Sequence, residues 1–191
     1  MGSGNSGLYP TLGVLNSTFL NNGENAQPME RYSDRGIEIP EYIKKAIKQL
    51  KFKGDYISDS KDKYSSTDVS VLSKETGVEY AKVTIGKKCY IIRGDKNGTT
   101  IPESIIARMK RESGKLDFHS HPHDDDCIPS VADRNMIKHL EQTTGQKTSQ
   151  IITPNGRTTL FNKEGVIQTG TVPNIIDDER KKALLKIFGG K

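Results

Sequence analysis

The chain has 191 residues, with 29 Lys and Arg against 24 Asp and Glu, a formal net charge of +5 and 32% hydrophobic residues. Its only cysteines, Cys89 and Cys127, are too few for a disulfide-built scaffold. No run approaches the roughly 18 apolar residues that a membrane-spanning helix requires. We therefore expect no membrane partner. The lysines are scattered without interleaved aromatic residues, so we expect no nucleic-acid partner either.

Residues 1–36 are rich in Gly, Ser and Asn and hold no persistent hydrophobic period. Such a segment lacks the apolar mass that would offset the entropy of ordering it, which predicts a flexible, disordered head. It has neither the charged region nor the apolar region of a secretory signal. A cytoplasmic location is therefore expected, with delivery by a specialised secretion system left open.

Residues 37–67 are predicted to form one amphipathic helix followed by a linker. Four apolar residues of the helix recur at i, i+3, i+4 and i+7, namely Ile43, Ala46, Ile47 and Leu50. This spacing gives one apolar face, which we expect to dock on the core or, as a helix over 37–50, on a partner protein. The polar stretch 51–67 predicts a loop.

Residues 68–175 alternate short strands with helices, which predicts an α+β domain whose mixed sheet is flanked by helices. Strands are expected over 79–85, 88–93, 99–101, 115–119, 148–153, 157–162 and 166–169. Helices are expected over 102–111 and 130–144. Residues 176–191 place acidic residues before lysines, which favours a C-terminal helical tail.

The segment 116–133, LDFHSHPHDDDCIPSVAD, contains the residues most suited to chemistry. Alternate side chains of a strand share a face, so His119 and His121 point the same way. Two imidazoles on one face are a platform for a divalent transition metal such as zinc. His123 and the acidic run 124–126 are more typical of a solvated loop.

Asp133 falls on the face of its helix that carries three apolar residues: Met136, Ile137 and Leu140. Its carboxylate is therefore expected on the buried side of the first helical turn. The Ser130-x-x-Asp133 spacing is also a capping box, so a capping role and a metal-binding role are both open for Asp133. Two histidines and an aspartate would leave a fourth position for water, as catalytic zinc requires.

The strings HSHP at 119–122 and SVAD at 130–133 resemble the JAMM (MPN+) metalloprotease motif, with a spacer one residue longer than the family's common pattern. The resemblance covers roughly residues 68–170. It implies an MPN/cytidine-deaminase-like fold and a zinc ion held by His119, His121 and Asp133. It also implies a glutamate that polarises the water and shuttles its proton, and a serine, Ser130, that stabilises the oxyanion.

The glutamate is expected near the start of the domain's first strand. Glu79 opens that strand forty residues before His119 and is preferred, and Glu75 in the turn-like KETG is the alternative. The resemblance implies an activity, the hydrolysis of a peptide or isopeptide bond in a protein or peptide. A ubiquitin-like conjugate is one substrate of this class. Two other functions stay open: a catalytically inactive MPN-like binding module, and a toxin- or mobile-element-associated domain similar to RadC.

Overall fold

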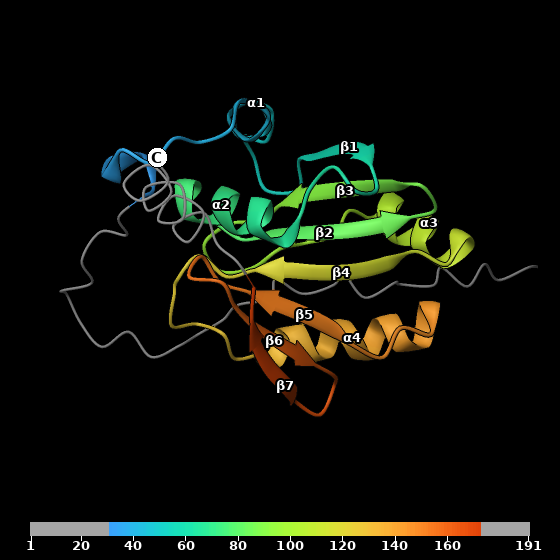
Figure 1. Cartoon of the computed structure of the whole chain (residues 1–191). Coiled ribbons are helices and arrows are strands. Elements are labelled where there is room, and N and C mark those ends of the chain that lie inside the picture. Colours follow the sequence, from blue (N-terminus) through green and yellow to red (C-terminus); the bar gives the residue numbers. More distant parts are fainter. Residues whose placement is uncertain (1–30, 173–191) are drawn as a thin grey trace, which may run out of the picture.

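The computed structural model describes residues 31–172, which form an α+β fold (Figure 1). Within this range seven strands make one mixed sheet in the order β1-β3-β2-β4-β5-β6-β7, and four α-helices cover its two faces. All neighbouring strands are antiparallel except β4 and β5, which are parallel. The predicted α+β class, with a mixed sheet flanked by helices, is confirmed. No helix in the described range is long and apolar enough to cross a membrane.

The elements have the following bounds. The strands are β1 (Tyr56–Ser60), β2 (Tyr80–Ile85), β3 (Lys88–Arg93), β4 (Lys115–Ser120), β5 (Ser149–Ile152), β6 (Arg157–Phe161) and β7 (Val166–Thr171). The α-helices are α1 (Glu41–Gln49), α2 (Ser66–Thr76), α3 (Glu103–Glu112) and α4 (Val131–Thr144). The predicted tail over 176–191 and most of the predicted head, 1–30, lie outside the described residues.

The prediction of a flexible head is wrong for its last six residues. A 3-10 turn, Ser33–Arg35, follows Tyr32, whose side chain is only 1% exposed. The Tyr32 hydroxyl donates a hydrogen bond to the carbonyl of Pro154, at 2.6 Å. One aromatic side chain thus anchors this segment to the core, which an average over a Gly- and Ser-rich stretch does not reveal.

The loop predicted over 51–67 is also wrong, because it contains β1 and the start of α2. Strand β1 has four exposed residues and one half-buried residue, so it shows no hydrophobic alternation. It forms because its backbone pairs with β3, from Tyr56 opposite Ile92 to Ser60 opposite Lys88. Ser65 caps α2, and Glu75 lies within this helix and not in a turn.

The strand predicted over 99–101 does not form. After β3 the chain makes a tight turn, closed by a single bridge between Asp95 and Gly98, and Thr99 then leads into α3. Pro102 stands at the N-cap of α3. Proline has no amide hydrogen and suits the beginning of a helix, so the chain turns away from the sheet here.

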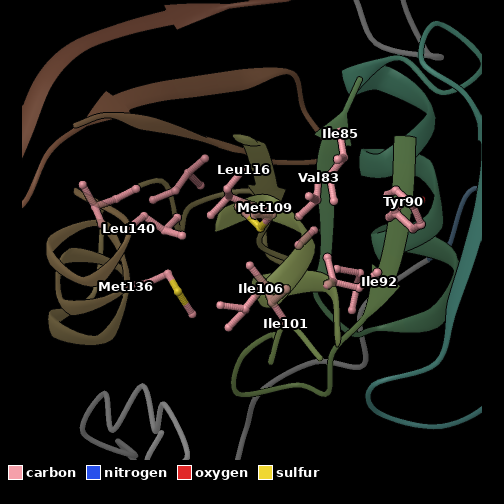
Figure 2. Packing of buried hydrophobic residues seen from close by; sticks show 14 of the residues in the cluster. Val83, Ile85, Tyr90, Ile92, Ile101, Ile106, Met109, Leu116, Met136 and Leu140 are labelled. Carbon is pink, nitrogen blue, oxygen red and sulfur yellow. The ribbon is translucent and has the colours of Figure 1, made fainter. Parts of the chain in front are cut away.

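Two hydrophobic clusters hold the helices on the sheet. Helices α3 and α4 pack on one face in a cluster that Figure 2 shows, where Ile106 and Met109 of α3 and Met136 and Leu140 of α4 join residues of β2, β3 and β4. Helices α1 and α2 pack on the other face. Ile43 and Ala46, on the apolar face of α1, belong to this second cluster. The apolar face of α1 therefore docks on the core of the chain.

A bulge in β4 changes which side chains share a face. The register of β2 on β4 shifts between Lys82, which pairs with Phe118, and Val83, which pairs with Leu116. The extra residue in β4 reverses the usual alternation. As a result Leu116 and His119, three residues apart, line the same pocket on the side of α3 and α4.

Candidate metal centre

The parallel pairing of β4 with β5 brings the two halves of the motif together. Parallel neighbours need a crossover, and here the crossover contains α4. Ligand sites of such sheets lie at the carboxyl ends of the strands, where the crossover begins. His119 lies near the end of β4 and His121 just after it, while Asp133 lies in the first turn of α4.

The two imidazoles and the Asp133 carboxylate converge. The Nε2 atoms of His119 and His121 are 3.1 Å apart. Asp133 Oδ1 lies 3.1 Å from His119 Nε2, and Asp133 Oδ2 lies 3.7 Å from His121 Nε2. Two donors about 2.05 Å from a tetrahedral metal are about 3.3 Å apart. The spacing of these three side chains therefore fits the ligands of one zinc-sized ion.

Strand pairing brings Glu79 to the same place. Ala81 of β2 lies opposite His119 of β4, and Glu79, two residues earlier, points to the same face. Glu79, His119 and His121 are all buried, and each offers a ligand atom within 4.8 Å of the others.

The other candidate glutamate is turned elsewhere. Glu75 accepts hydrogen bonds from the amide and the hydroxyl of Ser33, at 3.0 and 2.7 Å. Of the two glutamates, the structure brings Glu79 to the histidine pair.

The hydrogen bond at Nδ1 determines the tautomer of His121. His121 Nδ1 lies 2.8 Å from the backbone carbonyl of Asp126, which can only accept, so Nδ1 carries a hydrogen. The Nε2 lone pair of neutral His121 then points at the cluster, as metal ligation requires. His119 Nδ1 is buried without a partner in the described range, and the His119 ring packs edge-on against Phe161 at 5.9 Å.

Three electron-rich atoms this close repel one another unless a cation lies between them. The metal-free protein satisfies this demand with a proton. Burial acts to lower the pKa of His121, but Asp126, Glu79 and Asp133 outweigh it and raise this pKa to about 9. The charge distribution of the site thus favours a bound cation.

Asp133 serves as a helix cap and as a member of the cluster at once. Its Oδ2 accepts from the Ser130 amide at 2.8 Å and from the Ser130 hydroxyl at 2.7 Å, which leaves Oδ1 facing His119. Although burial acts to raise the pKa of Asp133, His119, His121 and Ser130 hold it below its usual range. The two roles left open by the sequence are compatible, because they use different oxygens.

Glu79 differs from Asp133 in its protonation. Burial raises the pKa of the Glu79 carboxyl, His121 and His119 oppose this effect, and Asp133 and Asp126 add to it. The site therefore holds one carboxylate stabilised as an anion and a second carboxyl that takes a proton more readily. Pairs of this kind are a recurring feature of acid–base sites.

The loop after His121 supports the site without adding ligands from its exposed residues. His123 and Asp125 are exposed, whereas Asp124 pairs with Lys74 of α2 at 3.3 Å. Asp126 was expected in a solvated loop, yet its carbonyl and carboxylate both contact His121 Nδ1. The sequence signal for Asp126 is only its nearness to the histidines.

A small pocket, part of it open to solvent, adjoins the cluster. It is lined by Glu79, Ala81, Thr99, Ile101, Leu116, His119, Asp133, Met136 and Phe161. Sequence patterns gave no reason to include Thr99 or Phe161, which come from a loop and from β6.

Comparison with known proteins adds no relative: no family model matches the chain, and no curated protein or solved structure matches it either.

Proposed function

We propose that this chain is a zinc-dependent hydrolase of JAMM (MPN+) type that cleaves a peptide or isopeptide bond. The observation that carries the proposal is the buried cluster at the β4–α4 crossover. There Glu79 lies within 4.8 Å of the two imidazoles, and Asp133 contacts both of them. The sheet with helices on both faces is in keeping with an MPN/cytidine-deaminase-like architecture.

In this proposal His119, His121 and Asp133 hold the ion. Two nitrogens and one carboxylate oxygen are ligands that zinc accepts in catalytic sites, with a fourth position left for water. Zinc, when bound, polarises a carbonyl and lowers the pKa of its water toward about 7. Asp126 orients His121, and Ser130 orients Asp133 through Oδ2.

Glu79 is the general base and then the general acid. Its carboxylate takes a proton from the attacking water as the carbon–oxygen bond forms. The same proton passes to the leaving amine as the carbon–nitrogen bond breaks. The raised pKa of Glu79 suits both transfers, because it lies nearer to neutrality than the pKa of an exposed glutamate.

The substrate is a protein or peptide, and a ubiquitin-like conjugate belongs to this class because its isopeptide bond is also an amide. Suitable probes are internally quenched peptides with one scissile amide and a matching glycyl-Nε-lysine isopeptide. In both, the leaving nitrogen takes the proton from Glu79 and departs as a neutral amine.

The decisive experiment combines metal analysis with Glu79→Gln. We expect one zinc per chain by mass spectrometry, retained in Glu79→Gln, with hydrolysis of the probes reduced about 10²-fold or more. Glu75→Gln is the matched control and should hydrolyse like the wild type. A wild type that neither holds zinc nor melts higher when zinc is added would overturn the proposal, and an active Glu79→Gln would remove Glu79 from the base role.

A further inference from the structure

Thr99, which has no role in the proposal so far, carries an unpaired hydroxyl. It lies between the Asp95–Gly98 bridge and α3, and its side chain is 9% exposed. Its Oγ1 atom is buried and has no hydrogen-bond partner within residues 31–172. Folded proteins rarely bury a hydroxyl unpaired, and each such group calls for a specific explanation.

The place of Thr99 suggests that explanation. It lines the same pocket as Glu79, His119 and Asp133. The remaining walls of the pocket are apolar: Ala81, Ile101, Leu116, Met136 and Phe161. Outside the cluster itself, Thr99 is thus the one hydroxyl among the lining residues.

The Thr99 hydroxyl lies close to the backbone of the turn before α3. A Cβ atom built on Gly94 would lie 2.6 Å from Thr99 Oγ1 and 2.4 Å from the carbonyl oxygen of Gly98. Only a glycine at position 94 allows the Thr99 side chain to lie so close to the backbone.

The obvious hydroxyl at the site is already engaged. Ser130 Oγ has a single hydrogen, and it donates this hydrogen to Asp133 Oδ2 at 2.7 Å. The Thr99 hydroxyl has no acceptor of its own in the described residues. Building on the proposed function, we propose that Thr99 donates a hydrogen bond to the carbonyl oxygen of the substrate amide as that oxygen becomes an oxyanion.

The test compares two substitutions at Thr99 with a matched control. Thr99→Val removes the hydroxyl and keeps the shape, whereas Thr99→Ser keeps the hydroxyl. Thr84→Val is the control, because the Thr84 hydroxyl of β2 donates to the carboxylate of Asp117 and so has a partner. Each variant is assayed for melting temperature without metal, zinc content and hydrolysis of the quenched peptide and isopeptide probes.

A substrate-binding hydroxyl and a structural one give opposite results. If Thr99 binds substrate, Thr99→Val keeps zinc and melts about 2–4 °C higher, because an unpaired buried hydroxyl is removed. Its kcat falls about 10²-fold with little change in KM, and Thr99→Ser stays within about threefold of the wild type. Thr84→Val should melt lower and keep its kcat.

Two outcomes would overturn the assignment of Thr99 alone: a Thr99→Val protein that melts as low as Thr84→Val, or one that keeps the wild-type kcat. In both cases the wild type still binds zinc and hydrolyses the probes. A wild type that does neither overturns the proposed function, and with it the role of Thr99.

Discussion

Loss of the His121 proton should make zinc affinity rise steeply between pH 7 and pH 9, a range in which an ordinary histidine is already neutral. Without metal the pKa of His121 is about 9: burial opposes its charge, but Asp126, Glu79 and Asp133 favour it more strongly. Histidine binds zinc only in its neutral form, so zinc must displace this proton. Lower pH therefore means weaker binding.

The size of the effect follows from competition between the proton and the metal. The affinity is reduced by the factor 1 + 10^(pKa − pH), which is about 100 at pH 7 and about 2 at pH 9 for the His121 pKa of about 9. The apparent affinity should thus rise about 50-fold across this interval. A histidine with an ordinary pKa of about 6.5 would change it by less than about 1.5-fold.

Competition against a chromophoric chelator at pH 7, 8 and 9 measures this rise, once corrected for the chelator's own protonation and for zinc hydrolysis. Calorimetry in two buffers of different ionisation enthalpy should show about one proton released from His121 near pH 7.5, in addition to the proton that a zinc-bound water of pKa about 7 loses. Asp126→Asn is the matched control. It removes a carboxylate that favours the charge on His121 but keeps the backbone carbonyl that accepts from Nδ1, so its pH dependence should shift to lower pH.

An affinity that stays flat from pH 7 to pH 9 would refute this reasoning, because His121 would then not hold a displaceable proton at the site. An unchanged profile in Asp126→Asn would show that the Asp126 charge plays no part in it.

Two further predictions concern stability. Ser130→Ala should lower the free energy of unfolding by about 1 kcal/mol, because α4 loses its N-cap, and should lower zinc affinity about tenfold, because Asp133 loses an orienting donor. The control is Ser65→Ala in the similar capping box of α2, which should lower the free energy of unfolding by the same amount and leave zinc affinity unchanged. In the metal-free protein the raised pKa of His121, about 9, contributes stability below pH 6.5 that is lost as the pH rises through 9. Urea unfolding should show a loss of about 3 kcal/mol over that range, and a stability that increased with pH would contradict the assignment.

Local patterns located most of the regular structure around the site. Strand β3 has the predicted bounds, and α4 begins one residue after its predicted cap, Ser130. These elements are readable because each buries one face, and burial imposes a period on the apolar residues. Strand β1 and the segment at Tyr32 escaped prediction because pairing with β3 stabilises the first and a single buried ring anchors the second.

The sequence alone predicted that His119, His121 and Asp133 form one cluster, because these residues lie within one strand–loop–helix segment whose local geometry is predictable. It preferred Glu79 but left Glu75 open as the alternative, and it gave no sign of Thr99 or of the contact between Asp126 and His121. Those assignments depend on the register of β2 on β4, the bulge in β4 and the path of the turn before α3. Such contacts join residues far apart in the chain, and only the packed structure brings them within hydrogen-bonding distance.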